Sequence, residues 1–275
     1  MISVIITSWK EPHTIGKCIR CIADRKYSGI QKPFEILQVS PDIETLNEGK
    51  RVSNELGLSS REYIQIQDPQ KGKPYALGLA IKKAKGNIIV FTDGDTYFEK
   101  DSIKYLLQPF EDPDIFGVSV RQISMDSRKS MMGYWGHLLS DSADMRRKEK
   151  MEKVRDEEYY KSSTSFFPLS GYIMATRNID FKLPSNILSD DAYISYYIRN
   201  LNKEIAYTPL AKCYVKYPTT LNDYYKQKVR SLGGYIQLKR LGIFKRDTQS
   251  RSICIEVRYS FLVLKYAKSI KELIW

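Results

Sequence analysis

The first hundred residues alternate between short apolar runs and segments with helical periodicity, and this alternation restricts the fold more than any other feature. The apolar runs predict strands over 3–7, 34–39, 63–67 and 87–92, and the segments between them predict helices over 14–25, 44–57 and 73–86. Thr14 is expected to cap the first helix, and Gly57 and Gly86 to end the second and third. Such alternation predicts an α/β fold with a mostly parallel sheet flanked by helices.

Polar side chains follow three of the four predicted strands, at the point where each strand ends. The three clusters are Thr7 to Glu11 (TSWKE), Ser40 to Asp42 (SPD) and Asp93 to Asp95 (DGD). Ligands of parallel α/β sheets bind at the carboxyl ends of the strands. We therefore expect these clusters to border one ligand-binding crevice.

The DGD cluster places two carboxylates one residue apart directly after an apolar strand. Such close carboxylates repel each other unless they share a cation or one of them is protonated. Hard oxygen ligands suit Mg²⁺ or Mn²⁺, and these ions in turn bridge phosphates. The alternative is a polar turn, because Asp-Gly is a common turn dipeptide.

The positive charge of the chain is concentrated in its last quarter. The formal net charge is +12, and residues 199–275 hold 16 Lys and Arg against 5 Asp and Glu, a net of +11. A charge excess confined to one region indicates a surface for an anionic partner. Nucleic acid, anionic lipid and a phosphorylated substrate all fit this charge.

The remaining composition indicates a cytoplasmic protein. We identify no secretory leader, and no apolar run approaches the roughly 18 residues that a membrane span requires. Four cysteines do not make a disulfide scaffold in a chain of 275 residues. Cys18 and Cys21 form a CxxC without a second ligand pair, so we expect them to pack in a helix rather than bind a metal.

Four motifs, taken in order, resemble those of family 2 glycosyltransferases. The stretch GKPYALGLAIKKAKGNIIVFTDGDTYF (72–98) is similar to that family's Gly-Lys loop, Ala-Leu-rich helix and strand before a DxD motif. LSDDAYI (188–194) resembles its Glu-Asp acceptor motif, and QKVRSLGG (227–234) resembles its Gln-x-x-Arg-Trp motif. With the N-terminal strand, the resemblance covers about residues 2–240.

The resemblance implies the GT-A fold, in which a nucleotide-binding α/β half continues into an acceptor-binding half. On this basis residues 1–100 are expected to form the nucleotide-sugar-binding half and residues 101–218 the acceptor-binding half. Residues 219–275 are expected to form a C-terminal extension of basic helices.

By resemblance, the donor-binding residues come from the strand ends and from the Gly-Lys loop. Asp95 is the implied direct ligand of Mg²⁺ or Mn²⁺, and Asp93 reaches the ribose or the base. Lys73 approaches the nucleotide, with a solvated first-turn lysine as the alternative. Trp9 packs near the base or serves as an apolar anchor, and Glu11 matches an acidic position of the same loop or is solvated.

Three further residues complete the implied donor site. Thr7 belongs to the cluster that ends the first strand. Asp42 is a candidate for recognising the base, with a helix cap as the alternative, because the family's acidic pair is incomplete here. Arg230 is expected to clamp the diphosphate; the alternative is a solvated polar face, since Gln227 and Arg230 share one side of a helix.

The implied acceptor site contains the general base. Asp191 matches the second acid of the family motif and is expected to deprotonate the acceptor hydroxyl, while Asp190 stands in place of the usual Glu. A helix cap formed by SDD is the alternative. Ser170 and Gly171 are expected to line the acceptor cleft.

Two further positions bear on the acceptor. Gln227 is expected to support the acceptor end of the site. Ser231 occupies the position of the motif's tryptophan, which weakens the case for a processive polymer synthase.

The sequence thus predicts a metal-dependent inverting glycosyltransferase that uses a UDP- or GDP-sugar and a hydroxyl acceptor, either a glycan or a lipid-linked molecule. Two alternatives are a nucleotidyltransferase acting on sugar phosphates and a basic nucleic-acid-binding protein. The first would need a Gly-rich phosphate loop after the first strand, and the second would leave the acidic motifs without a role. No nucleic acid partner is therefore expected.

The last residues predict a membrane contact. In residues 251–275, apolar residues recur at helical spacing with basic residues between them. This pattern indicates an amphipathic helix that contacts an anionic membrane peripherally, on the inner face, with a helix packed on the domain as the alternative.

Overall fold

The computed structural model describes residues 1–162, 166–179, 182–243 and 266–275. Within these ranges the strands form a single mixed sheet. The strands are β1 (Ile2–Thr7), β2 (Phe34–Ser40), β3 (Tyr63–Gln67), β4 (Ile88–Asp93), β5 (Tyr97–Phe98), β6 (Ile115–Ser124), β7 (Glu152–Lys153), β8 (Tyr160–Lys161), β9 (Ile173–Arg177) and β10 (Glu204–Val215).

Helices connect most of these strands. They are α1 (Ile15–Ala23), α2 (Arg25–Ser28), α3 (Ile43–Glu55), α4 (Lys73–Ile81), α5 (Ser102–Leu107), the 3₁₀-helix η1 (Gln108–Glu111), α6 (Met131–Lys150), α7 (Asp190–Asn200), α8 (Leu221–Arg240) and α10 (Ile270–Ile274).

The sheet combines a parallel N-terminal part with a mixed C-terminal part. The strand order is β3-β2-β1-β4-β9-β6-β10-β8-β7, and β5 pairs with β10. All pairs among β1, β2, β3 and β4 are parallel, whereas β9 runs antiparallel to both β4 and β6. The parallel part follows from the helical connections, since parallel neighbours require a crossover.

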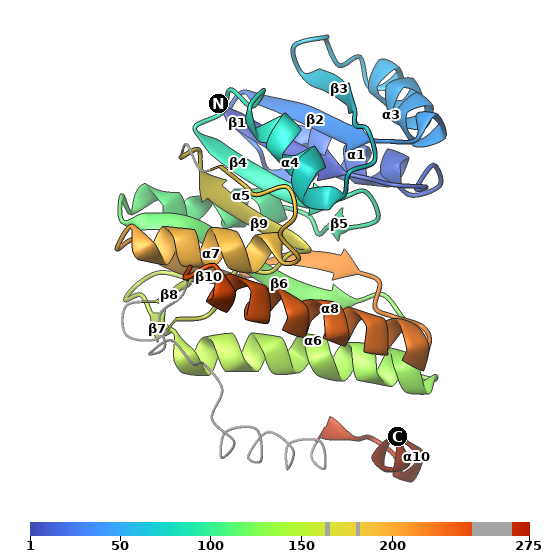
Figure 1. Ribbon diagram of the computed structural model, residues 1–275, viewed down its shortest axis with the longest axis vertical. Coiled ribbons are helices and arrows are strands. Elements are labelled where there is room, and N and C mark those ends of the chain that lie inside the picture. Colours follow the sequence, from blue (N-terminus) through green and yellow to red (C-terminus); the bar gives the residue numbers. More distant parts are fainter. Residues whose placement is uncertain (163–165, 180–181, 244–265) are drawn as a thin grey trace.

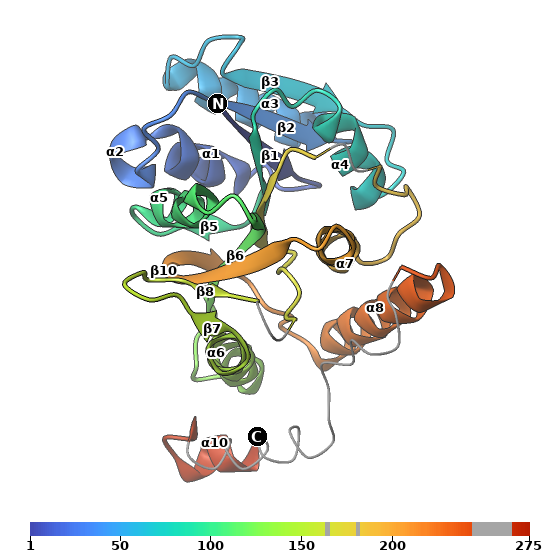
Figure 2. The same ribbon diagram turned by 90° about the vertical axis from the view of Figure 1, so that its left-hand side faces the viewer.

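Helices cover both faces of the sheet (Figures 1 and 2). Apolar side chains of α1 and α5 pack with Ile2, Val4 and Ile6 on one face. Ile5, which points the opposite way along the same strand, packs with α4 and α7 on the other face. This division explains why every residue of β1 is buried.

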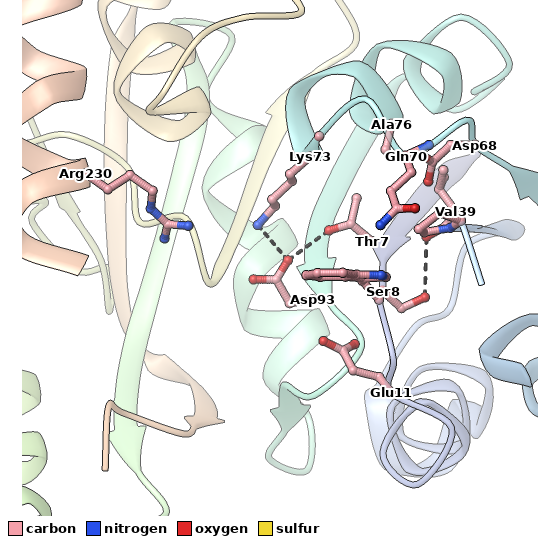
Figure 3. A pocket seen from close by; sticks show the side chains of 13 residues that line it. Thr7, Ser8, Glu11, Val39, Asp68, Gln70, Lys73, Ala76, Asp93 and Arg230 are labelled. Carbon is pink, nitrogen blue, oxygen red and sulfur yellow. Dashed lines mark hydrogen bonds and ion pairs between the residues drawn. The ribbon is translucent and has the colours of Figure 1, made fainter. Parts of the chain in front are cut away.

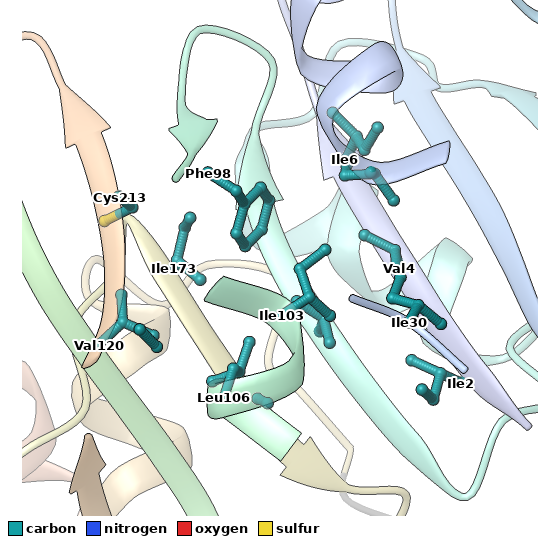
Figure 4. Packing of buried hydrophobic residues seen from close by; sticks show 14 of the residues in the cluster. Ile2, Val4, Ile6, Ile30, Phe98, Ile103, Leu106, Val120, Ile173 and Cys213 are labelled. Carbon is teal, nitrogen blue, oxygen red and sulfur yellow. The ribbon is translucent and has the colours of Figure 1, made fainter. Parts of the chain in front are cut away.

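The larger apolar cluster joins the two parts of the sheet. Figure 4 shows Ile103 and Leu106 of α5 lying between β1 and the C-terminal strands that carry Val120 and Ile173. Fully burying each such side chain contributes about 1.5–3 kcal/mol relative to leaving it exposed. The strand ends are thereby held in fixed relative positions.

The four predicted strands and three predicted helices of the first hundred residues are present. Gly57 adopts the left-handed conformation, with φ of 67°, just beyond the end of α3, as predicted. Thr14 stands at the N-cap position of α1, but its hydroxyl does not cap the helix. It donates instead to the backbone carbonyl of Glu11, at 3.3 Å, so the capping prediction was wrong.

The predicted end of α4 at Gly86 was also wrong, because the helix ends at Ile81. The role of Gly86 is a close approach to β1. Its amide donates to the hydroxyl of Ser3 at 2.7 Å, and an added Cβ would lie 2.4 Å from the backbone nitrogen of Ser3. Only glycine fits at this contact.

The described parts of the C-terminal extension contain helices, as predicted. These helices are α8 and α10. The end of α10 is held beside the start of α6, where Nε1 of Trp135 donates to the backbone carbonyl of Trp275 at 3.0 Å. Arg128, just before α6, pairs with Glu272 of α10 at 2.7 Å. Most of the predicted amphipathic helix over 251–275 lies outside the described residues. In the described part of the chain, no helix is both long enough and apolar enough to cross a bilayer.

Candidate active site

The register between β1 and β4 brings the first two site residues together. Thr7 and Asp93 are opposite each other where the two parallel strands end. The hydroxyl of Thr7 donates to Oδ1 of Asp93 at 2.8 Å, and Nζ of Lys73 lies 2.6 Å from the same oxygen (Figure 3). The prediction that the strand-end clusters meet is therefore confirmed for these positions.

Lys73 reaches this point because α4 begins next to the ends of the strands. Gly72 precedes the helix with φ of 98° and ψ of 159°, a conformation that L-residues rarely adopt, and Pro74 occupies the first turn. The unpaired amides at the N-terminus of a helix favour anions. The Gly-Lys loop thus presents an ammonium group and a helix N-terminus at the same place.

A cavity of about 520 Å³ opens beside this contact, and we call it the first cavity. It lies along the carboxyl ends of β1, β2, β3 and β4. Its lining includes Thr7, Ser8, Trp9, Glu11, Pro41, Asp68, Gln70, Lys73, Asp93 and Arg230. Its volume is within the range of small-molecule and cofactor sites, about 300–1,000 Å³.

Burial and neighbouring acidic groups disfavour the ionised forms of Glu11 and Asp95, next to the first cavity. Oε2 of Glu11 is buried and has no hydrogen-bond partner among the described residues. Burial, reinforced by the charges of Asp95 and Asp93, raises the pKa of Glu11 to about 8. Burial and the charge of Asp93 likewise raise the pKa of Asp95. A bound cation would relieve both effects.

These residues fit a divalent metal of the kind that is shared with a phosphate ligand. The described residues contain no group of three or more His, Cys, Asp or Glu side chains placed to hold an ion by themselves. Mg²⁺ is commonly bound through one or two carboxylates, with substrate phosphates and water completing its coordination. Asp93 and Asp95 can supply such a partial set, whereas a closed structural metal site does not fit.

Asp42 is engaged in local structure. Its carboxylate accepts from the amide of Thr45 at 2.9 Å, which caps α3, and from the amide of Lys10 at 2.7 Å. Partial burial favours a higher pKa for Asp42, but these hydrogen bonds lower that pKa below its usual value. The neighbouring Pro41, not Asp42, lines the first cavity.

A second cavity of about 410 Å³ adjoins the first. It contains every residue predicted for the acceptor site, and the two cavities share Lys73, Asp93 and Arg230. Its other lining residues include Ser170, Gly171, Tyr172, Ser189, Asp190, Asp191, Gln227, Lys228 and Ser231. Residues far apart in the sequence thus form one continuous site.

The carboxylate of Asp191 is held on one side and open on the other. Its Oδ1 accepts from the hydroxyl of Ser189 at 2.6 Å and from the amide of Ala192 at 2.8 Å. No described residue donates to Oδ2, which faces Gly171, where an added Cβ would lie 3.1 Å away. The hydroxyl of Ser189 makes no cap bond to α7. It orients Asp191 instead.

Lys73 links the acidic groups of the two cavities. Burial opposes its charge, but the carboxylates of Asp93, Asp190 and Asp191 raise the pKa of Lys73. Burial raises the pKa of Asp190, and Asp191 adds to this effect while Lys73 opposes it. The lysine side chain remains 36% exposed, so it can also contact a ligand.

Hydrogen bonds also fix the far wall of the second cavity. The hydroxyl of Ser170 accepts a hydrogen bond from the side-chain Nε2 of Gln122. Nε2 of Gln227 donates to the hydroxyl of Tyr172 at 3.3 Å, which connects α8 to the segment before β9. Gln122 therefore fixes the hydroxyl of Ser170, and Gln227 fixes that of Tyr172.

Some lining residues were missed from the sequence. Asp68 and Gln70 follow β3 and line the first cavity, and Tyr172 and Ser189 line the second. Asp68 and Gln70 could have been found, because the segment after the third strand ends at the same edge of the sheet as the three clusters that were identified. Tyr172 and Ser189 carry no such signal.

Comparison with known protein families shows to which family this chain belongs. The family described as "Glycosyltransferase like family 2" matches residues 1–234. The chain belongs to glycosyltransferase family 2. The four motifs recognised in the sequence and both cavities lie within the matched residues.

The curated relatives of this family 2 chain are longer proteins. A poly-beta-1,6-N-acetyl-D-glucosamine synthase of Staphylococcus aureus is 22% identical over 179 residues, which cover 65% of this chain and 42% of that protein. An N-acetylglucosaminyltransferase of Azorhizobium caulinodans is 25% identical over 141 residues, 49% of this chain and 35% of that protein. The match thus spans less than half the length of these relatives.

Solved structures confirm that this family 2 chain has the GT-A fold. The mannosyltransferase PcManGT from Pyrobaculum calidifontis, in complex with GDP-Man and Mn²⁺, superimposes with a TM-score of 0.64 at 16% identity, covering 90% of this chain and 65% of that chain. Staphylococcus aureus TarS 1-349, in complex with UDP-GlcNAc, gives 0.55 at 16% identity, covering 80% and 59%.

Proposed function

We propose that this protein is a metal-dependent, inverting glycosyltransferase that moves a sugar from a nucleotide-diphospho-sugar to a hydroxyl acceptor. The observation that carries the proposal is the shared boundary of the two cavities, formed by Lys73, Asp93 and Arg230. A donor in the first cavity and an acceptor in the second would place the bond to be broken at this boundary.

The first cavity suits the nucleotide diphosphate. Lys73, Arg230 and the N-terminus of α4 provide positive charge and hydrogen-bond donors for the two phosphates. Trp9 offers a flat apolar surface for the base, and Asp68 in the same cavity would accept hydrogen bonds from the polar edge of the base. Family membership favours this role over that of a nucleotidyltransferase or a nucleic-acid-binding protein.

The acidic residues at the end of β4 would hold the metal. Asp95 is the proposed ligand, with Asp93 beside it, and a bound cation would favour the ionised form of the nearby Glu11. A bound Mg²⁺ or Mn²⁺ would supply positive charge where negative charge develops on the leaving diphosphate. Mn²⁺ is present in the complex of the Pyrobaculum calidifontis mannosyltransferase.

Asp191 is the proposed general base. Its open Oδ2 would accept the proton of the acceptor hydroxyl, while Ser189 and Ala192 hold Oδ1 in place. The acceptor oxygen would then attack the anomeric carbon from the side opposite the diphosphate. The bond from that carbon to the phosphate oxygen breaks, the nucleoside diphosphate leaves, and the configuration inverts.

The donors to examine first are UDP- and GDP-sugars, because solved structures with this fold contain UDP-GlcNAc and GDP-Man. The acceptor is a hydroxyl of a glycan or of a lipid-linked molecule. The basic charge of residues 199–275 supports a peripheral contact with anionic lipid at the cytoplasmic face of a membrane.

Nucleotide binding tests the proposal directly. Thermal-shift measurements with UDP, GDP, ADP and CDP, each with and without Mn²⁺, should give a metal-dependent stabilisation by UDP or GDP. The stabilising nucleotide then selects the sugar donors, whose turnover is followed by release of the nucleoside diphosphate. Equal responses to all four nucleotides, with no effect of Mn²⁺, would contradict the proposal.

A further inference from the structure

Helix α8 carries a continuous row of exposed apolar side chains, which we call the α8 stripe. Leu221, Tyr225, Val229, Leu232 and Ile236 are each between 45% and 68% exposed. Their spacing places them within an arc of about 80° on a helix that turns about 100° per residue. Single exposed apolar residues are common, but a row of five on one helix face indicates an interaction surface.

The opposite face of α8 holds the helix on the domain. A Cβ added to Gly234 would lie 2.7 Å from Cβ of Ser189, so the two helices α7 and α8 approach closely there. Leu238 is fully buried, and the ring of Tyr224 packs edge-on against Trp135 of α6. The packed residues fix the rotation of α8, and the α8 stripe therefore faces outward.

Basic residues border the α8 stripe on both sides. Residues 221–240 contain five basic side chains and only one acidic side chain, Asp223. By helical periodicity, Lys228 and Lys239 fall along one edge of the stripe, and Lys226 and Arg240 along the other. Apolar residues flanked by long basic side chains are typical of a helix that lies in a membrane interface.

We propose that the α8 stripe rests on the surface of an anionic lipid bilayer. The apolar side chains would enter the boundary between headgroups and acyl chains, and the flanking lysines and arginine would contact anionic headgroups. A contact between two copies of this chain through the same stripe would instead bring two rows of positive charge together. Charge complementarity therefore favours the lipid surface.

The position of α8 connects this surface to the second cavity. Gln227, Lys228, Arg230 and Ser231 line that cavity from the same helix that carries the stripe. By helical periodicity Lys228 also lies at the edge of the stripe, whereas the other three residues face away from it. A bilayer under the stripe would therefore bring the headgroup layer to the rim of the cavity at Lys228, where a lipid-linked hydroxyl could enter. This last point rests on the proposed function, because it takes the second cavity as the acceptor site, whereas the lipid contact itself does not.

Sedimentation with lipid vesicles, without donor or acceptor, tests the proposal. The parent protein should bind vesicles of phosphatidylcholine mixed with phosphatidylglycerol, and binding should weaken as salt is added. Changing Leu232 and Ile236 together to Glu should weaken binding roughly 100-fold, because apolar burial is lost and two negative charges are added. Changing Lys239 and Arg240 together to Gln should weaken it roughly 30-fold on the anionic vesicles alone.

Ile43→Glu is the matched control, since Ile43 is 57% exposed at the start of α3, on the nucleotide-binding half. It should bind vesicles as the parent does. The proposal is overturned if the parent protein does not bind vesicles at low salt, which is the result expected if the α8 stripe binds a protein. It is also overturned if the α8 variants bind vesicles as the parent does. Nucleotide-induced thermal shifts of the same variants report on the first cavity separately, so a failure of the proposed function would be recognised independently.

Discussion

Nζ of Lys73 lies 2.6 Å from Oδ1 of Asp93, and both residues line both cavities. One residue begins a helix, and the other ends a strand that follows it in the chain. The ion pair therefore lies where a leaving diphosphate and an incoming acceptor would meet. The ammonium group of Lys73 also interacts with the carboxylates of Asp190 and Asp191 in the second cavity.

Replacing Lys73 by Gln should weaken binding of the nucleoside diphosphate about 10- to 100-fold, because a hydrogen bond from a charged donor contributes about 1.5–3 kcal/mol. Calorimetric titration with UDP or GDP measures this change. Lys71→Gln is the matched control, since Lys71 is exposed and its ammonium lies over the ring of Tyr75. Equal affinities of the Lys73 variant and the parent would remove Lys73 from the donor site.

Asp95→Asn should abolish the part of nucleotide binding that depends on Mn²⁺ while leaving the fold intact. The reason is that the amide is a weaker ligand of a hard cation than the carboxylate. Titrations with and without Mn²⁺ measure the metal-dependent increment. Asp114→Asn, at an exposed position that lines neither cavity, provides the control. An unchanged increment in the Asp95 variant would show that another residue holds the metal.

Asp191→Asn should retain donor binding but reduce sugar transfer on the order of 10²–10⁴-fold, the usual contribution of a positioned general base. Transfer is followed by release of the nucleoside diphosphate in the presence of acceptor, and donor binding by calorimetry. Asp190→Asn serves for comparison, because it removes the adjacent carboxylate. A variant at Asp191 with near-normal turnover would move the role of base to Asp190 or elsewhere.

Gly171→Ala should displace the carboxylate of Asp191, since the added Cβ would lie 3.1 Å from Oδ2. We expect kcat to fall about tenfold or more with donor binding unchanged, because a misplaced base loses catalytic efficiency. Gly78→Ala is the matched control. An added Cβ there meets nothing within 4 Å, and alanine within α4 should raise stability by about 0.5–1 kcal/mol. Equal kcat in the two variants would contradict this view of Gly171.

Glu272→Gln should loosen the attachment of the C-terminal segment to α6. Hydrogen bonds from Arg128 and from the amide of Lys268 lower the pKa of Glu272 to about 2, from 4.5. The carboxylate therefore contributes stability that is fully present above pH 4.5 and is lost as the pH falls towards 2.

The melting temperature of this variant should lie below that of the parent at neutral pH, and the difference should narrow as the pH falls below 4.5. Glu44→Gln, at the exposed start of α3, is the control and should show no such narrowing. A difference that stays constant down to acid pH would show that the Arg128 pair does not stabilise the segment.

Local sequence pattern predicted the strands of the first hundred residues well. Strands β1 to β4 stand at the predicted places, because each is a continuous apolar run between turn residues. The ends of helices were predicted less well. Thr14 and Gly86 have residue types typical of a helix cap and a helix end. Instead, the hydroxyl of Thr14 donates to the carbonyl of Glu11, and Gly86 packs closely against the backbone of Ser3.

The candidate site was predictable where residues follow strands directly. Thr7 and Asp93 were expected together, since neighbouring parallel strands end at the same edge, and the register confirms it. The helix cap given as the alternative role of Asp42 is confirmed, because its carboxylate accepts from the amide of Thr45. Its second bond, from the amide of Lys10, and the bond from Ser189 to Asp191 were not predictable in this way.

The sequence by itself determined the α/β class, the family and the edge of the sheet where the acidic residues gather. These follow from periodicity and motif order, which are properties of neighbouring residues. Only the tertiary structure decided that Lys73 pairs with Asp93 and that Gly171 leaves room for Asp191. It also decided that the α8 stripe faces outward. Contacts between residues distant in the chain depend on how helices and strands pack, and sequence spacing does not specify that packing.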